Sequence, residues 1–276
     1  MKRPLRSIYG QYVATVDDFR LIASLGLITG QWGNQMPLGD TNNIVMFDDF
    51  DGAALLGTWS VLKGTDAAAA NFATNAGVSG TILGTTGATT TTMAGSGVQI
   101  TGGLNFKAQG AAGTGGTNNL EFNSRVKVDV ITNQVMFVGL TNAATLQMPI
   151  QGSGVGNAFT GNANDAVGFL FDTTMTTAAW WCVGNKAGAG PQGFLATAPG
   201  GSNNAPVAAT FAQFAISVDQ LGNANFFYNG VQVGVTMLGA LTPTVALTPI
   251  VAVFNRTAAA SRNPQIDYIM TSMNRI

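Results

Sequence analysis

The stretch that most constrains the fold is 214–233, FAISVDQLGNANFFYNGVQV. Apolar residues alternate with small or polar ones over 214–218, which is the two-residue period of a strand with one buried face. The same period returns over 224–228, and Asn229-Gly230 then predicts a type I′ turn, because both central residues of that turn need a positive φ. Two tight reversals that join three short strands predict an antiparallel sheet.

Short strands are also predicted along most of the chain after residue 44. In Phe122–Ile131 we expect Phe122 and its alternate residues to be buried, and Asn123 and its alternate residues to face water. Gln134–Leu140 is the predicted hairpin partner of that strand, and Gly184–Pro206 is a predicted long loop. About twelve to fourteen short strands without a long helix predict an all-β, two-sheet antiparallel sandwich.

Residues 1–43 differ from the rest of the chain, and we assign them as an N-terminal arm preceding a sandwich domain at 44–276. The sequence around Thr15–Asp18 resembles a capping box and predicts a short helix over about 16–25. One interpretation is a strap across the chain's own sandwich, and the other is an arm that docks on a neighbouring subunit. The candidate partner-binding residues of the arm are Arg3, Arg6, Tyr9, Tyr12, Phe19 and Trp32.

The chain carries very few charges. Asp, Glu, Lys and Arg make up 9% of the residues and the formal net charge is −1. Such a balance provides no general attraction to nucleic acid, and the apolar runs are too interrupted to span a membrane, so neither partner is expected. A surface with few charges favours burial against other protein. The alternative is an ordinary sandwich with a Thr- and Asn-rich polar surface.

The reactive residue types are scarce. Cys182 is the only cysteine and histidine is absent, which excludes an intrachain disulfide and nucleophile systems that use histidine. Trp180 and Trp181 are adjacent, so on a strand they point to opposite faces and we expect at most one of them in the core. The other is predicted to be exposed, in a pocket, in an interface, or stacked on a sugar ring. Cys182 itself is predicted to be a small buried hydrophobe.

Three segments carry a family resemblance. Phe47-Asp48-Asp49-Phe50-Asp51-Gly52 followed by Trp59, the hairpin at 218–230 and the closing strand at 266–269 resemble the concanavalin A-like lectin/glucanase jelly rolls. The resemblance covers about residues 44–272 and implies a jelly-roll sandwich, in a family that includes hydrolases, lectins and structural modules. The phrases NSRVKVDVITNQVMFVGLTN and GFLFDTT…WWCVGN are also similar in style to sandwich modules of tailed-bacteriophage structural proteins.

The resemblance also suggests where sites would lie. Glucanases of the family place their carboxylates in an E-x-D-x-x-E strand, whereas this chain has a single glutamate, Glu121, outside any such pattern. We therefore predict that the chain is not an enzyme. A calcium ion often bridges the first and last strands in the family, and this implies Asp49, Asp51 and Asp267 as metal candidates. The alternative is that these carboxylates cap turns at strand ends, and no other cofactor is expected.

These observations lead to a functional hypothesis. We expect a structural protein of a bacteriophage virion, a decoration or cement protein on the outer capsid surface that binds across junctions of the major capsid protein. Copies are expected to form a homo-oligomer, with a trimer at a threefold position as the simplest case. One alternative is a carbohydrate-binding tail, fibre or head-fibre module for host attachment. The other, a glycan-cleaving enzyme, requires a carboxylate pair that the sequence does not reveal.

Overall fold

The computed structural model describes residues 6–8, 11–13, 43–50, 55, 59–65, 71–75, 80–87, 96–103, 106–109, 119–256 and 261–274. The chain divides into two units, 1–45 and 46–274. In the first unit, β1 (Arg6–Ile8) and β2 (Gln11–Val13) pair as an antiparallel hairpin. The helix expected at 16–25 lies outside the described residues, and the assignment of 1–43 as an arm stays a prediction.

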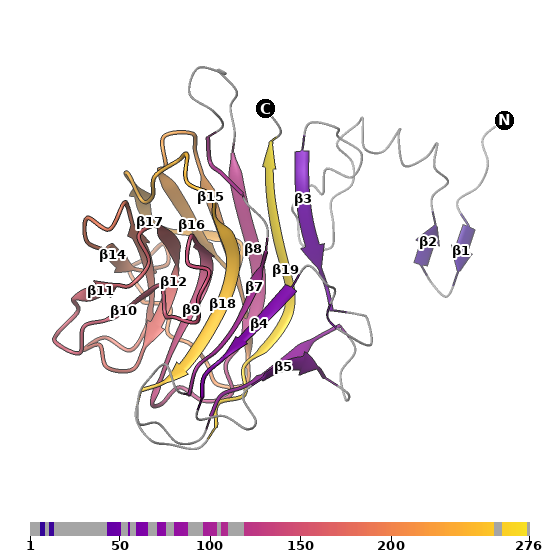
Figure 1. The fold of residues 1–276 in the computed structure, drawn as a ribbon, viewed down its shortest axis with the longest axis horizontal. Coiled ribbons are helices and arrows are strands. Elements are labelled where there is room, and N and C mark those ends of the chain that lie inside the picture. The colour runs from indigo at the N-terminus through magenta and orange to yellow at the C-terminus, as the bar shows by residue number, and fades with distance from the viewer. Residues whose placement is uncertain are drawn as a thin grey trace. The chain divides into compact units, whose positions relative to one another are not determined.

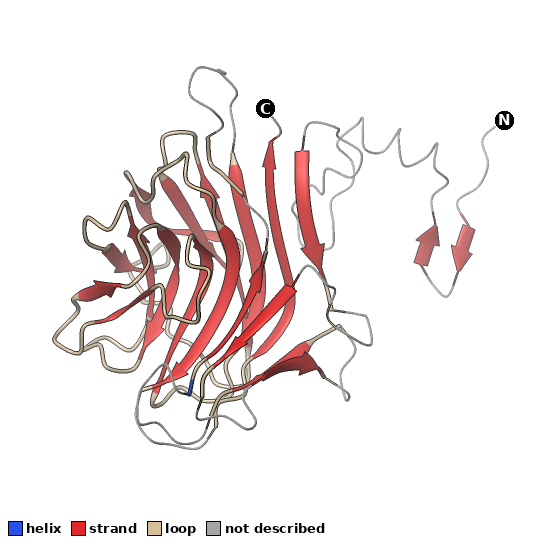
Figure 2. Cartoon of the chain, viewed as in Figure 1, coloured by secondary structure: helices blue, strands red, loops and turns tan. Residues whose placement is uncertain are grey.

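The second unit is built from strands, drawn in red in Figure 2. One sheet has seven strands, in the order β14 (Gln192–Leu195), β13 (Trp180–Asn185), β12 (Ala166–Asp172), β9 (Gln134–Thr141), β18 (Thr248–Asn255), β7 (Val98–Gly102) and β4 (Trp59–Lys63). The other has eight strands, in the order β17 (Val231–Met237), β16 (Ala224–Tyr228), β15 (Phe211–Val218), β8 (Leu120–Lys127), β19 (Gln265–Asn274), β6 (Ile82–Thr85) and β5 (Asn71–Thr74), with β3 (Asn43–Asp48) also paired to β19. A separate hairpin is formed by β10 (Ile150–Gly152) and β11 (Phe159–Gly161).

The two sheets form a sandwich, as Figure 1 shows. The described strands pair with their neighbours in antiparallel orientation. The predicted all-β two-sheet sandwich is confirmed. Within the described residues, no helix is long and apolar enough to cross a membrane.

The predicted turn at the end of β16 is confirmed. Asn229 and Gly230 have φ angles of 49° and 79°, the positive values that a type I′ turn requires. At the preceding reversal, the carboxylate of Asp219 accepts hydrogen bonds from the backbone N–H groups of Leu221 and Asn223, at 2.8 and 2.9 Å. Local chemistry therefore determines both reversals of this meander.

The predicted pairing of β8 with β9 is wrong. β8 pairs with β15 and β19, whereas β9 lies in the other sheet between β12 and β18. All residues of β9 are buried, so this strand needs a sheet that is covered on both faces, while β8 keeps partly exposed Arg125 and Lys127 on one face. The segment between β8 and β9 therefore crosses from one sheet to the other.

Two further sequence expectations are corrected. The predicted loop at 184–206 contains β14, which extends the seven-stranded sheet by pairing with β13. Asn123 is buried rather than exposed, because its side-chain oxygen accepts hydrogen bonds from the Tyr268 hydroxyl at 2.8 Å and the Gln213 amide at 3.3 Å. Burial also raises the pKa of the Tyr268 hydroxyl, so this contact stays a neutral hydrogen bond.

Aromatic rings fill the space between the sheets. Phe169 of the seven-stranded sheet contacts Phe214 and Phe226 of the other sheet, with ring centroids 5.1 and 5.5 Å apart, and Trp180 lies 4.6 Å from Phe214. Cys182 is fully buried on β13, as predicted, and burial raises the pKa of its thiol. Contacts of this kind hold the two sheets together.

A second apolar cluster, which we call the hairpin cluster, lies on the other face of the seven-stranded sheet. Strand residues Phe137, Trp181 and Phe254 pack there against residues of the segment that carries β10 and β11. The full set of buried members is Val135, Phe137, Ala143, Met148, Ile150, Ala163, Ala166, Leu170, Met175, Trp181, Val183, Ile250, Ala252 and Phe254. The seven-stranded sheet is therefore buried on both faces over much of its area.

A buried ion pair fastens the hairpin over this cluster. Asp172, fully buried at the end of β12, pairs with Arg256 just after β18. Both groups also bind β10, because Asp172 accepts from the Gly152 N–H at 2.7 Å and Arg256 donates to the Gly152 carbonyl at 2.9 Å. The Asp172 carboxylate accepts further bonds from Thr174. Its lone pairs are thus well satisfied, as a buried charge requires.

Candidate functional site

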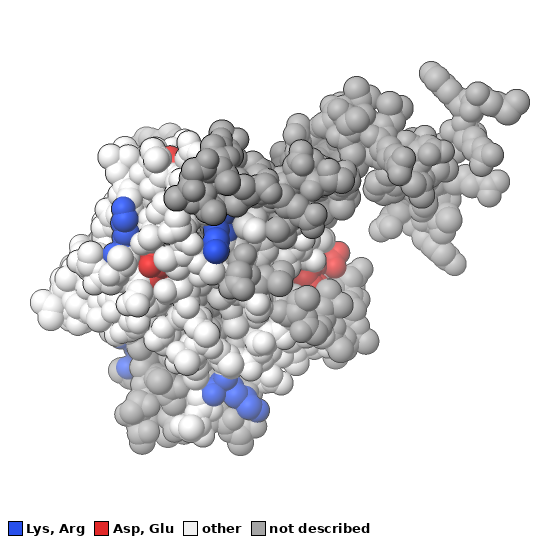
Figure 3. All heavy atoms as spheres, turned by 45° about the horizontal axis from the view of Figure 1, so that its top comes forward, with Lys and Arg blue, Asp and Glu red and all other residues white. Residues whose placement is uncertain are grey.

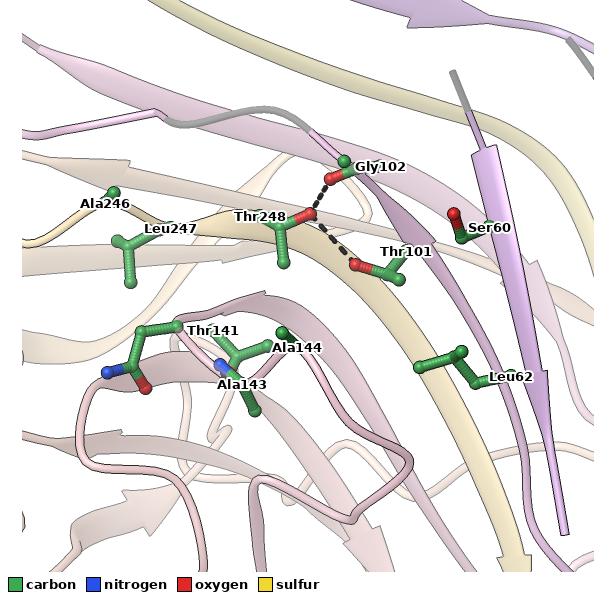
Figure 4. Close-up of a pocket in the computed structure, with 12 residues that line it drawn as sticks. Ser60, Leu62, Thr101, Gly102, Thr141, Ala143, Ala144, Ala246, Leu247 and Thr248 are labelled. Atoms are coloured by element: carbon green, nitrogen blue, oxygen red, sulfur yellow. Dashed lines mark hydrogen bonds between the residues drawn. The ribbon is translucent and has the colours of Figure 1, made fainter. Parts of the chain in front are cut away.

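A hollow beside the sheets, here called the threonine groove, shares Ala143 with the hairpin cluster. It encloses about 250 Å³ over the strands β4, β7 and β18 and beside the segment that follows β9. The polar side chains that line it are Ser60, Thr101, Thr141, Asn142 and Thr248, and Leu62 is among the apolar ones. Figure 4 shows these side chains.

Hydrogen bonds order the threonine hydroxyls on the floor of the groove. The Thr248 hydroxyl donates to the carbonyl oxygen of Gly102, and the hydroxyl oxygens of Thr101 and Thr248 are 2.9 Å apart (Figure 4). Because Thr248 uses its proton on Gly102, Thr101 donates to Thr248 and keeps its own oxygen lone pairs for an incoming donor. The arrangement therefore presents a fixed acceptor.

The wall of the groove supplies a donor. The side-chain oxygen of Asn142 accepts from the backbone N–H of Asp165 at 3.1 Å, which leaves its amide hydrogens available to a ligand. None of the described lining residues is charged or titrates near neutral pH. The groove is thus suited to a neutral ligand rich in hydroxyl groups, which can both donate to Thr101 and accept from Asn142.

One residue of the acidic motif at the end of β3, Asp48, has a structural role. The carboxylate of Asp48 accepts from the Phe50 N–H at 2.7 Å and from the indole Nε1 of Trp59 at 2.8 Å. Phe50 has a φ of 54°, and its ring lies 5.9 Å from that of Trp59. Asp48 therefore caps the turn after β3 and ties it to β4.

The calcium candidates are not brought together by described contacts. Asp49 is exposed after β3, Asp267 pairs with Arg125 of β8 at 2.6 Å, and Asp51 lies outside the described residues. Within the described part of the chain, no group of three or more Cys, Asp or Glu residues is placed to hold a metal ion. The calcium site stays a prediction.

The partner-binding candidates lie in the first unit. Arg6 is in β1 and Tyr12 is in β2, where the register pairs Arg6 with Val13 and Ser7 with Tyr12. The remaining candidates, Arg3, Tyr9, Phe19 and Trp32, lie outside the described residues. Their role in binding a partner stays a prediction.

The expectation that one of the adjacent tryptophans lies outside any core is wrong. Trp180 is 2% exposed and Trp181 is 6% exposed. They do point to opposite faces of β13, but the second face is covered by the hairpin cluster, where Trp181 packs edge-on against Phe159 at 5.5 Å. Neither ring is therefore available for stacking on a sugar at the surface.

Comparison with known proteins finds similarity in fold alone. No protein-family model and no curated protein matches the sequence. Among solved structures, the carbohydrate recognition domain of Emp47p has a TM-score of 0.56 at 10% identity, covering 86% of this chain and 99% of that one. Bacillus licheniformis β-glucanase has a TM-score of 0.52 at 10% identity and covers 84% and 98%. Peanut lectin has a TM-score of 0.53 at 9% identity and covers 84% and 98%.

The fold is a concanavalin A-like jelly roll. This confirms the resemblance at the level of the fold. The prediction that the chain is not an enzyme is contradicted, because its structural neighbours include glycoside hydrolases. At identities of 10–13% these neighbours show a shared fold and assign no reaction to this chain.

Sequence reasoning missed the threonine groove. Thr101 and Thr248 are 147 positions apart, and they meet because β7 and β18 are neighbours in the sheet. Each hydroxyl alone is an ordinary feature of a strand. A pairing of β7 with β18, had it been known, would have been the signal that placed the two hydroxyls together.

Proposed function

We propose that this chain is a structural protein of a bacteriophage virion, a decoration protein that binds across junctions of the major capsid protein on the outer capsid surface. The observation that carries the proposal is the scarcity of surface charge. Figure 3 shows one face of the molecule, where charged side chains are separated by wide uncharged areas. Only two ion pairs are formed among the described residues. A surface of this kind favours protein contacts.

Exposed apolar side chains support the same proposal. Val235 and Leu238 are each 73% exposed in and just after β17, an edge strand of the eight-stranded sheet, and Val231 at its start is 48% exposed. Uncharged edges with apolar side chains tend to associate with other protein. In the proposal, copies of the chain associate as a homo-oligomer, such as a trimer, and the arm at residues 1–43 contacts the major capsid protein.

A binding assay with phage heads tests this proposal. Heads of the phage that encodes the chain, stripped of the protein, are mixed with the full chain or with a variant lacking residues 1–40, and co-sedimentation is measured. The full chain is expected to bind and to raise the temperature at which heads release DNA. The truncated chain is expected to keep its β-sheet circular dichroism and lose binding. Failure of the full chain to bind heads would refute the proposal, and full binding by the truncated chain would refute the role of the arm.

The threonine groove favours a second candidate function, a carbohydrate-binding module for host attachment. Its fixed acceptor at Thr101 and donor at Asn142 suit the hydroxyl groups of a neutral sugar. Two structural neighbours are a carbohydrate recognition domain and a lectin, which is consistent with this candidate at the level of the fold.

A glycan array followed by titration calorimetry tests the second candidate. Thr101→Val removes the acceptor while keeping the side-chain shape, and is expected to weaken the binding of any array hit by about tenfold, as the loss of one hydrogen bond predicts. Thr236→Val is the matched control, because Thr236 lies on β17 in the other sheet and donates to Asn225. Equal affinity in both variants would place the sugar outside the groove.

A further inference from the structure

The outer face of the eight-stranded sheet carries one charge without an ionic partner at each end of β8. Glu121 and Lys127 lie six positions apart on this strand, so their side chains point to the same face, about 20 Å from each other. Glu121 is exposed and Lys127 is half-buried, while Phe122 and Val126 point into the core. Neither charge forms an ion pair with a described residue. The strand therefore presents a negative end and a positive end to solvent.

Between these two ends the face carries no unpaired charge on β8, β15 or β16. Ala215 of β15 lies in register between Asn123 of β8 and Phe227 of β16, and Ala215 and Phe227 are half-buried. Arg125 lies on the same face, and Asp267 pairs with it within the same copy at 2.6 Å. The centre of the face thus holds small, apolar or already paired side chains, which cost little to remove from water.

A second copy of the chain complements this distribution of charge. A two-fold axis that crosses the strands at the level of Ser124 exchanges the two ends of β8. Glu121 of each copy then lies opposite Lys127 of the other, and the two contacts are identical by symmetry. Sheets packed face to face lie about 10 Å apart, a distance that extended Glu and Lys side chains bridge together. The face is therefore complementary to itself in this orientation.

The area of the face is adequate for a stable pair. The strands β17, β16, β15, β8 and β19 are neighbours in the sheet, and β15 has 8 residues. At about 4.8 Å between strands and about 3.4 Å per residue, they offer roughly 650 Å² in each copy. A pair would bury about 1,300 Å², which lies within the range of about 1,200–2,000 Å² for specific interfaces.

We propose that two copies of this chain pair through the outer face of the eight-stranded sheet, with their β8 strands antiparallel and Glu121 of each copy opposite Lys127 of the other. This inference deepens the homo-oligomer of the proposed function and rests on that part of it, with a two-fold pair as the first unit of assembly. The arm and its contact with the major capsid protein play no part in the pairing.

Exchange of the two charges tests the pairing, with sedimentation velocity of the full chain as the measurement. The wild type is expected to be a dimer. Glu121→Lys places Lys opposite Lys at both ends, and Lys127→Glu places Glu opposite Glu, so each variant is expected to weaken dimerisation at least about tenfold. When the two variants are mixed, every contact is again Lys opposite Glu. The mixture is therefore expected to form a heterodimer, and the double variant is expected to dimerise like the wild type.

Lys186→Glu is the matched control, because it makes the same change in net charge on the exposed loop after β13 of the other sheet. It is expected to leave dimerisation unchanged. A monomeric or trimeric wild type, dimers that survive in both single variants, a mixture that stays monomeric, or an equal loss in the control would overturn the pairing. Monomers that still sediment with phage heads would overturn the pairing alone, and dimers that fail to bind heads would refute the capsid role alone.

Discussion

The outer faces of the two sheets differ in how deeply they are buried. On the eight-stranded sheet, β15 alternates strictly between buried and half-buried residues, and its outward side chains meet partly exposed neighbours such as Arg125. On the seven-stranded sheet, every residue of β9, β12 and β13 is buried, because the hairpin cluster covers the outer face. One sheet is thus an ordinary half-buried surface, while the other is the middle layer of three.

This difference shows where specific contacts are concentrated. The hairpin is held over the seven-stranded sheet by Asp172 and Arg256, and the threonine groove remains at the edge of the covered area. The outer face of the eight-stranded sheet contains a partly exposed ion pair between Arg125 and Asp267. Substitutions at matched positions on the two sheets should therefore have unequal effects on stability.

The largest difference is expected between two phenylalanines. Phe137 is fully buried in the hairpin cluster, and its change to Ala leaves a cavity. Phe137→Ala should therefore lower the free energy of unfolding by about 3–5 kcal/mol. Phe227→Ala, on β16 of the eight-stranded sheet, should cost only about 1 kcal/mol, because part of its ring already contacts water. Urea unfolding monitored by fluorescence measures both. Equal costs would mean that the hairpin cluster does not act as a core.

The two ion pairs give the next comparison. Arg256→Ala leaves the buried Asp172 carboxylate without its cation and removes the hydrogen bond to the Gly152 carbonyl. We therefore expect the free energy of unfolding to fall by about 3 kcal/mol. Arg125→Ala breaks a pair whose side chains are 37% and 20% exposed, and a loss below about 1 kcal/mol is expected. Hydrogen exchange should show faster exchange in β10 for the first variant alone. Unchanged exchange in β10 would mean that the pair does not fasten the hairpin.

The adjacent tryptophans allow the two faces of a single strand to be compared. Both Trp→Phe variants remove similar ring volume, but Trp181→Phe also removes a satisfied hydrogen bond to Thr177, whereas Trp180→Phe removes a donor without an acceptor. Trp181→Phe should therefore be less stable than Trp180→Phe by about 1 kcal/mol. Thermal unfolding of the two variants side by side provides the measurement, and the reverse order would contradict it.

The smallest effect is expected at the threonine groove. Thr101→Val removes a hydroxyl at the floor of the groove, where water can replace its contact with Thr248, so the cost to stability should be about 1 kcal/mol or less. The same scans that compare the other variants measure it. A large loss would show that the hydroxyl pair serves the fold rather than a ligand.

The sequence predicted those parts of the fold that local patterns determine. The alternation over 214–218 and the Asn229-Gly230 turn correctly placed β15, β16 and their reversals. Period alone does not choose a partner strand, however, and so the pairing of β8 with β9 was predicted wrongly. The continuous apolar runs of β9 and β12 required a cover on each face, but nothing local identified 143–175 as that cover.

The sites were harder to predict than the strands. Asp48 and Trp59 were correctly singled out as a motif, and the structure shows that they are joined by a hydrogen bond. The threonine groove arises from residues far apart in the chain. Its polar side chains can be placed together only once the order of strands in the sheet is known.

Cys182 has a practical consequence for studying this molecule. It is the only thiol in 276 residues, it lies opposite Phe169 and Phe194 in the sheet, and its raised pKa keeps it protonated. An alkylating reagent attacks the thiolate and needs access, so it should modify the chain only when β13 becomes exposed. The rate of alkylation under native conditions therefore measures how often this part of the sheet opens. A cysteine introduced at the surface would also react with a fluorophore without competition from the native thiol.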